Sequence, residues 1–351
     1  MKMFKRMIAS SVAVALLFSL TACGSAKKET PAPKEEPKQV AEPAQPAKES
    51  ENKAEKKIVL GFSQIGAESE WRTANTESIK QAAKDAGIEL KFADAQQKQE
   101  NQLKAIRSFI AQKVDVIAFS PVVESGFETV LQEAKAAGIP VILTDRAVDV
   151  QDDSLYVTFM GSDFVEEGRK AARWLVEYME KQGRGQEEIN IVELQGTVGS
   201  APAIDRKKGF EEIIKDKSNY KIIKSQTGDF TRAKGKEVME AFLKSDGKNI
   251  DVLYAHNDDM AIGAIQAIEE YGLKPGKDII IVSIDAVKGA FEAMMAGKLN
   301  CTVECSPLLG PQLMQAVKDI VAGKEVPKRI VTEEGIFPAE VAEKEFPNRK
   351  Y

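Results

Sequence analysis

Short apolar runs recur along the chain, and amphipathic segments of helical length separate them. The expected strands cover residues 57–63, 88–92, 114–119, 140–144, 156–160, 189–194, 220–224, 252–255, 279–283 and 299–305. The first expected helix ends near residue 86, and another begins near residue 203. The remaining helices are expected at 99–112, 127–137, 165–181, 232–245, 260–271, 288–296 and 311–321, and a final extended segment follows. Because the strands are nearly continuous runs of Val, Ile and Leu, helices are expected on both faces of each sheet.

The order of strands and helices predicts an α/β fold. Ala-Gly-Ile occurs at 86–88 and at 137–139, and Tyr-Gly-Leu at 271–273 is similar. Each marks a helix end, a glycine stop and a new strand. Strand–helix–strand units at this spacing form right-handed crossovers on a parallel sheet.

A polar connection before residues 156–160 marks the crossing to a second set of units. We therefore expect two doubly wound parallel-sheet lobes joined by a hinge of several crossovers. The N-terminal lobe would hold 57–161 with 305–333, and the C-terminal lobe 162–304 with 334–351. Ligands of such sheets bind outside the carboxyl ends of the strands, and two facing lobes form a cleft that closes by hinge motion.

The N-terminus resembles an export signal. Lys2, Lys5 and Arg6 precede the uncharged run 7–20, which is too short to span a bilayer as a helix but suits a signal peptide core. The run ends in Leu-Thr-Ala-Cys at 20–23, so residues 1–22 look like a bacterial lipoprotein signal whose lipid joins Cys23. The alternative is an ordinary secretory signal with an incidental cysteine.

Residues 23–56 are mainly Lys, Glu, Pro, Ala and Gln. Such a stretch cannot bury enough apolar surface to fold, so we interpret it as a disordered tether.

Charge, cysteine spacing and histidine count argue against nucleic-acid binding, a disulfide and a metal site. The net charge of −5 gives no electrostatic reason to bind nucleic acid. Cys301 and Cys305 are four residues apart in one predicted strand, about 13 Å, which is too far for a disulfide. His256 is the only histidine, so we expect no metal site and no catalytic role for it. The two cysteines are interpreted as small core side chains.

Polar side chains gather where the strands end. Asp145 and Arg146 follow the strand 140–144, and an acid beside a base can pair with both the donors and the acceptors of a polyol. Trp71 and Phe230 could stack on the apolar face of a sugar ring. The full set at these exits is Trp71, Arg72, Asp94, Asp145, Arg146, Arg206, Phe230, Asn257, Asp285 and Glu304.

Each candidate also has a structural interpretation. Trp71 and Phe230 could be core residues, and Asp145 with Arg146 could be a structural ion pair. Arg206 begins a basic run and could be solvated. Of the three residues 257–259, we expect one to cap the following helix and one to bind.

At these residues the chain resembles a known family, the type I periplasmic sugar-binding proteins of ABC importers, a ribose-binding-protein-like class. The likeness covers 57 to about 345 and is strongest to galactofuranose-binding members. The most specific stretches are Gly-Asp-Phe-Thr-Arg at 228–232 and His-Asn-Asp-Asp-Met at 256–260.

The resemblance implies a monomeric receptor, without cofactor, that closes on a monosaccharide and delivers it to an ABC permease. The sugar would be galactofuranose or a related pentose or hexose. Family contacts map onto Glu68, Ser69, Trp71, Arg72, Asp145, Arg146, Arg206, Asn257, Asp285 and Glu304. The lipid anchor at Cys23 would hold the receptor to the outside of the cell membrane.

Two positions depart from the family pattern. Glu70 stands where a glycine is expected near the ligand, and Ala286 stands where a glycine is expected after Asp285. The first departure bears on sugar fit and the second on the geometry of a turn.

Other functions remain to be weighed. A sensory receptor would use the same fold to present the sugar to a membrane sensor kinase or chemoreceptor. An enzyme is disfavoured, because nothing in the sequence resembles a nucleophile elbow, a phosphate loop or a metal cluster.

The lipoprotein interpretation predicts that Cys23→Ser releases the protein from membranes, because serine offers no thiol to receive the lipid. Cell fractionation followed by immunoblotting measures this, with Ser25→Ala as a control that stays in the membrane fraction. Membrane retention of the Cys23 variant at the wild-type level would contradict the interpretation.

Overall fold

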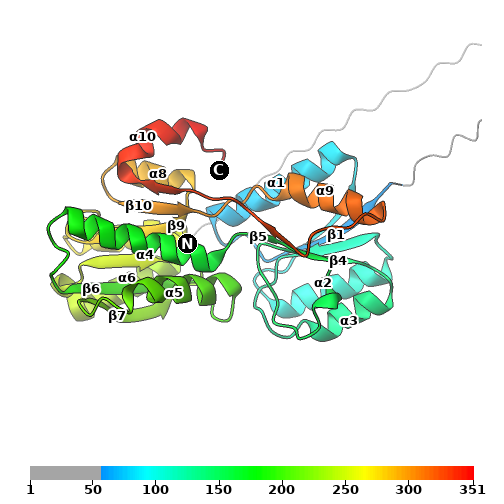
Figure 1. The fold of residues 1–351 in the computed structure, drawn as a ribbon, viewed down its shortest axis with the longest axis horizontal. Coiled ribbons are helices and arrows are strands. Elements are labelled where there is room, and N and C mark those ends of the chain that lie inside the picture. The colour runs from blue at the N-terminus through cyan, green and yellow to red at the C-terminus, as the bar shows by residue number, and fades with distance from the viewer. Residues whose placement is uncertain (1–56) are drawn as a thin grey trace, which may run out of the picture. The chain divides into compact units, whose positions relative to one another are not determined.

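The computed structural model describes residues 57–351, which form two six-stranded sheets with helices on both faces (Figure 1). The expected signal peptide and tether lie outside the described residues. Among residues 57–351, no helix is both long and apolar enough to cross a bilayer.

The first sheet is entirely parallel, in the order β11-β5-β4-β3-β1-β2. Its strands are β1 (Val59–Gln64), β2 (Glu89–Asp94), β3 (Val116–Phe119), β4 (Val141–Thr144), β5 (Thr158–Gly161) and β11 (Arg329–Val331). Its helices are α1 (Glu70–Ala86), α2 (Gln99–Ala111), α3 (Glu128–Ala136) and α9 (Gly310–Val321). Strand β11 comes from near the C-terminus, yet it pairs with β5 and forms one edge of this sheet.

The strands of this sheet bury both faces. Val116 and Ala118 of β3 pack with Leu313 of α9 in one apolar cluster, while Ile117 and Phe119 pack in another. This alternation follows from the two-residue period of a strand. As Figure 1 shows, α1 and α9 cover one face and α2 and α3 the other.

The second sheet has the order β12-β10-β9-β8-β6-β7, and only its edge pair, β12 with β10, is antiparallel. Its strands are β6 (Ile189–Gln195), β7 (Tyr220–Thr227), β8 (Val252–Ala255), β9 (Ile280–Asp285), β10 (Cys301–Glu304) and β12 (Ile336–Pro338). Its helices are α4 (Phe164–Lys181), α5 (Ala201–Ile214), α6 (Arg232–Asp246), α7 (Asp258–Glu270), α8 (Lys288–Met295) and α10 (Ala342–Glu345). The predicted α/β class with two doubly wound lobes is confirmed.

The chain passes between the two sheets three times: after β5, after β10, and between β11 and β12. Glu334 ties these crossings together, because its Oε1 accepts hydrogen bonds from Ser162 Oγ and from the backbone N of Ser306 at 2.8 Å. Burial, followed by the neighbouring Glu167, raises the pKa of Glu334 to about 9. The hinge carboxyl is therefore protonated at neutral pH.

The C-terminal segment differs from the sequence prediction. It is not wholly extended, because it contains the short helix α10. Ala342 of α10 is fully buried in the core of the second lobe, and Tyr351 is nearly so. The charged sequence around Ala342 shows no apolar periodicity, so docking against the rest of the lobe decides the conformation.

Helices α4 and α5 approach each other closely enough to require glycine. A Cβ on Gly168 would lie 2.2 Å from the backbone O of Arg206, and one on Gly209 would lie 1.9 Å from the O of Val165. This contact holds Glu167 of α4 beside Arg206 of α5, whose Nε and the carboxylate Oε2 are 2.7 Å apart.

A buried pair, Glu193 and His256, contacts Arg206. His256 Nε2 lies 3.0 Å from Glu193 Oε1, and the backbone O of His256 accepts a hydrogen bond from Arg206 Nη1 at 2.6 Å. Burial would raise the pKa of Glu193, but the hydrogen bond and charge of His256, Ser225 and Lys207 outweigh it and lower that pKa to about 2. Burial also lowers the pKa of His256, although Glu193 opposes the shift.

This pair predicts a specific pH dependence. The pKa of Glu193 falls from 4.5 to about 2 on folding, which corresponds to about 3 kcal/mol of stability. That contribution is complete above pH 4.5 and is lost as the pH falls toward 2. Glu193→Gln should therefore lower the free energy of unfolding by about 3 kcal/mol at pH 7.

Urea unfolding between pH 7 and pH 2.5 measures the difference between this variant and the wild type, which should shrink as the pH falls. The control is Glu188→Gln, since the Glu188 side chain is 59% exposed and pairs only with Lys221 at the surface. A difference that stays constant with pH would contradict the prediction.

Candidate functional site

A cavity that is partly open to solvent lies between the carboxyl ends of the two sheets, with about 290 Å³ of empty space when the open part is included. It is lined by Glu68, Ser69, Trp71, Arg72, Asp145, Arg146, Pro202, Arg206, Phe230, Asn257, Asp285 and Cys305. The lining comes from both lobes, as expected for a hinged cleft.

The start of α1 builds one wall. Ser69 caps the helix, its Oγ accepting a hydrogen bond from the N of Arg72 at 3.1 Å. The Arg72 guanidinium is then fixed by two carboxylates, Glu68 Oε1 at 3.0 Å from Nε and Asp145 Oδ2 at 2.7 Å from Nη2. These two ion pairs orient the Arg72 guanidinium without a ligand.

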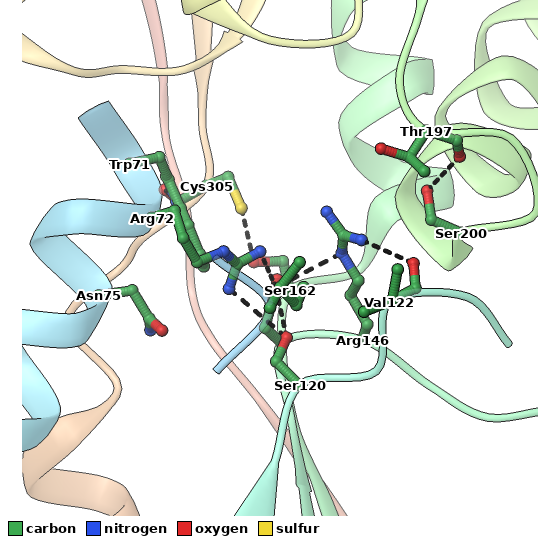
Figure 2. A network of polar contacts seen from close by, with 12 residues as sticks. Trp71, Arg72, Asn75, Ser120, Val122, Arg146, Ser162, Thr197, Ser200 and Cys305 are labelled. Atoms are coloured by element: carbon green, nitrogen blue, oxygen red, sulfur yellow. Dashed lines mark hydrogen bonds and ion pairs between the residues drawn. The ribbon is translucent and has the colours of Figure 1, made fainter. Parts of the chain in front are cut away.

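Asp145 and Arg146 are not a tight pair with each other. The principal partner of Asp145 is Arg72, and Ser120 Oγ also donates to Asp145 Oδ2 at 3.0 Å. Arg146 Nε is 3.7 Å from the same oxygen, while Arg146 Nη1 donates to the O of Val122 at 3.0 Å (Figure 2). Arg146 is thus held mainly through one end of its guanidinium.

The electrostatic setting of Arg146 is unfavourable without a further partner. Burial, followed by the nearby charge of Arg72, lowers the pKa of Arg146 to about 10. The guanidinium still carries its charge at neutral pH. Its Nε is buried and has no hydrogen-bond partner among residues 57–351.

The opposite wall is built on α5, α7 and β9. Arg206 reaches from α5 and is bound by Glu167 and by the backbone of His256, with Asp285 Oδ1 3.7 Å from its Nη2. Burial raises the pKa of Asp285, and Arg206 opposes this shift. Asn257 caps α7 through Oδ1, which accepts from the N of Met260, and its Nδ2 donates to the O of Phe230.

Asn257 therefore caps the helix and also lines the cavity. One member of 257–259 thus caps the helix, as expected, and the binding role stays a prediction. Asp258, the first residue of α7, is buried, and Thr302 Oγ1 and the N of Val287 donate hydrogen bonds to its carboxylate.

Two aromatic rings line the cavity, one from each lobe. Trp71 is fixed by its Nε1, which donates to the O of Cys305 at 2.6 Å (Figure 2). Phe230 faces Arg146 of the other lobe, with the guanidinium carbon 5.2 Å from the ring centroid. Both rings are almost completely buried.

The backbone is left-handed at three lining positions that are not glycine. The φ angles of Asp145, Phe230 and Asp285 are 62°, 61° and 131°. Ala286, which replaces an expected glycine, also has a φ of 60°. Such conformations cost about 1–3 kcal/mol each and persist where the surrounding structure imposes them, often at binding sites.

The ionisable groups of the lining are balanced in number. Glu68, Asp145 and Asp285 face three guanidinium groups, those of Arg72, Arg146 and Arg206. A cavity with equal numbers of acids and bases offers donors and acceptors without favouring an ion of either sign, which suits a neutral polyol.

The cavity brings together ten of the twelve residues named as candidates from the sequence. Glu304 is not among them, because its carboxylate binds Arg349 Nη2 at 2.8 Å and Tyr351 Oη at 3.2 Å. Asp94 also lies elsewhere and accepts from the N of Gln96. Sequence reasoning missed Pro202 and Cys305, although Cys305 directly follows a strand and could have been counted among the strand exits.

Glu167, Cys305 and Glu334 are close enough that one ligand atom of each lies within 4.8 Å of the others. Each is otherwise engaged: Glu167 binds Arg206, Glu334 accepts from Ser162 and Ser306, and burial raises the pKa of the Cys305 thiol well above its usual value. Glu167 and Glu334 are therefore already paired within the protein, Glu167 with Arg206 and Glu334 with the hinge segments.

Comparisons with known proteins agree with this geometry. Residues 60–325 match a family described as periplasmic binding protein domain. The galactofuranose-binding protein YtfQ of Escherichia coli is 52% identical over 84% of this chain and 92% of its own length.

Two solved structures are also similar. A protein from Mycobacterium smegmatis in complex with β-D-fucofuranose is 58% identical, with a TM-score of 0.81 over 84% of this chain and 95% of that one. The binding component of the arabinose ABC transporter from Shewanella sp. ANA-3, bound to α- and β-L-arabinofuranose, is 53% identical, with a TM-score of 0.79 over 84% of this chain and 96% of that one.

The family match covers most of the described residues, and these relatives are matched over nearly their whole length. The chain therefore belongs to the periplasmic binding protein domain family and is similar to its sugar-binding, ribose-binding-like members.

Proposed function

We propose that this protein is the solute-binding receptor of an ABC importer and closes its two lobes on a monosaccharide. The observation that carries this proposal is a pair of buried, unsatisfied polar atoms on two residues that line the cavity. Glu68 Oε2, an acceptor, and Arg146 Nε, a donor, are buried without a hydrogen-bond partner among the described residues. An unpartnered buried polar group costs about 1–3 kcal/mol, and a sugar hydroxyl can satisfy either one.

The relatives support a sugar in the five-membered ring form. YtfQ is named for galactofuranose, and the two similar structures hold fucofuranose and arabinofuranose. The ligand proposed for this chain is galactofuranose or a related pentose or hexose in its furanose form. The relatives favour this import role over presentation of the sugar to a membrane sensor.

The proposed contacts are the ten predicted residues that line the cavity: Glu68, Ser69, Trp71, Arg72, Asp145, Arg146, Arg206, Phe230, Asn257 and Asp285. Arg72 and Arg206, each already bound by carboxylates, would donate their remaining N–H groups to ring hydroxyls. Trp71 and Phe230 would contact the apolar face of the sugar. Glu304 is left out, since it anchors the C-terminal segment.

Membership of the family implies an extracytoplasmic location. Beyond that we propose a monomer with lobes formed by 57–161 with 305–333 and by 162–304 with 334–351, anchored to the membrane through a lipid on Cys23 and delivering sugar to a permease. We also propose binding without turnover, because Asp145 and Glu68 are committed to Arg72 and neither is placed as a free acid or base.

Isothermal titration calorimetry tests the ligand. The panel is D-galactose, L-arabinose, D-fucose, D-ribose and D-glucose, and we expect micromolar or tighter binding of at least one of the first three. The anomeric ¹³C resonance of the bound, labelled sugar then reports its ring form. Absence of heat from every sugar would overturn the proposal, and a bound pyranose would overturn its furanose part.

The site assignment predicts that Asp145→Ala and Arg146→Ala each lower sugar affinity by at least about 100-fold. Removing one member of a buried charged set costs about 2–5 kcal/mol, largely because the remaining charge loses its partner. Arg107→Ala, which breaks a surface ion pair with Glu133, is the control and should bind normally. Thermal unfolding of each variant checks that it is folded. Wild-type affinity in either site variant would reject that residue as a contact.

A further inference from the structure

Glu70 stands next to the cavity but does not line it. It is the first residue of α1, between the lining residues Ser69 and Trp71. Its carboxylate instead crosses to the other lobe, where Oε2 lies 2.8 Å from Nη2 of Arg232. The acid that replaces an expected glycine thus makes an ion pair between the lobes.

Asp259 completes this contact. Its Oδ2 accepts a hydrogen bond from the backbone N of Glu70 at 2.8 Å, and its Oδ1 lies 2.5 Å from Nε of Arg232. The Asp259 side chain is only 5% exposed, whereas Glu70 and Arg232 are 32% and 47% exposed. Asp259 is therefore the buried centre of the cluster, and Glu70 and Arg232 form its outer part.

Three helices begin at this cluster. Glu70 starts α1, Arg232 starts α6, and Asp259 is in the first turn of α7. Helix N-termini carry partial positive charge and unpaired N–H groups, so two carboxylates are well placed among them. Because α1 belongs to one lobe and α6 and α7 to the other, separating the lobes would break the contacts from Glu70 to both Arg232 and Asp259.

A glycine in α8 leaves room for the Glu70 carboxylate. A Cβ on Gly289 would lie 3.0 Å from Glu70 Oε2, 3.0 Å from Ile262 Cδ1 and 3.5 Å from Arg232 Nη2. Any side chain at 289 would press on the ion pair, so this glycine gives an independent way to disturb the cluster.

We propose that Glu70, Arg232 and Asp259 form an interlobe latch that stabilises the closed state and slows release of the bound sugar. The effect on sugar release rests on the proposed function, whereas the effect on closure does not. None of the three side chains lines the cavity. The latch therefore acts on closure alone and should shift the affinity for every sugar by the same factor, without changing the order of preference.

The size of the effect follows from the exposure of the outer ion pair. Half-exposed pairs contribute little and are screened by salt, so removing the Glu70 carboxylate should weaken binding about two- to fivefold. Apparent affinity scales with the population of the binding-competent state, and the loss should appear mainly as faster dissociation.

The test compares wild type with Glu70→Gln, Arg232→Gln and the double variant, by calorimetry and stopped-flow dissociation of D-galactose and L-arabinose. Each single variant should dissociate two- to fivefold faster at 50 mM NaCl, with a smaller difference at 500 mM NaCl. The double variant should be no worse than Arg232→Gln alone, because the Glu70 ion pair is already lost in that variant. Arg107→Gln, which breaks an equally exposed pair within one lobe, should leave dissociation unchanged.

Gly289→Ala supplies a second line of evidence. The variant should dissociate faster, because the alanine Cβ presses on the Glu70 carboxylate. Its midpoint of thermal unfolding is measured as well, since alanine is the better helix former but its Cβ also presses on Ile262. A purely structural effect would lower the midpoint of thermal unfolding and leave the dissociation rate unchanged, and that result would count against the latch.

Small-angle X-ray scattering of the sugar-free protein separates the latch from the proposed function. Glu70→Gln should have a larger mean radius of gyration than wild type at 50 mM NaCl. If sugars bind, equal dissociation rates in wild type and the Glu70 and Arg232 variants overturn the latch and leave the receptor function intact. If no sugar binds, equal scattering overturns the latch, and unequal scattering supports it while the receptor function fails.

Discussion

The structure depends on compensating three guanidinium groups that are buried where the two lobes meet. A charge removed from water needs a partner and hydrogen bonds, or it destabilises the fold. Arg72 obtains both from Glu68 and Asp145, and Arg206 from Glu167 and the backbone of His256. Arg146 is compensated less completely. Arg72 and Arg206 therefore belong to the wall of the cavity, whereas Arg146 is the arginine best placed to pair with a ligand.

Closure of the lobes has to be favourable with ligand and marginal without it. Contacts in three places contribute to this balance: the hinge, the cavity and the edge of the cleft. The hinge holds a protonated Glu334 between the crossing segments, so it adds no second negative charge beside Glu167. The cavity supplies directional hydrogen bonds, and the cluster around Asp259 adds contacts at the edge of the cleft. A ligand shifts the equilibrium only by its differential affinity for the closed state, so small terms outside the cavity carry weight.

Much of this could be predicted from the sequence, because parallel sheets place strand ends at one edge and polar residues at those ends are visible in the chain. That logic gathered, around one cavity, residues that follow β4, end β9 and begin α1. It failed for Glu304, whose partners Arg349 and Tyr351 lie in a segment without periodicity. The sequence also does not show that Asp145 pairs with Arg72 more closely than with Arg146. The left-handed backbone at Asp145 turns the side chains of Asp145 and Arg146 apart, and this conformation is not visible in the sequence.

The interleaving of the two sheets has a consequence for how the chain can fold. The first sheet takes its edge strand β11 from residues near the C-terminus, and α9 supplies Leu313, Met314 and Val317 to its core. That core cannot be completed until nearly the whole polypeptide has been synthesised. A nascent chain would therefore remain without a finished lobe for most of its translation, a property compatible with threading through a membrane before the final tertiary contacts form.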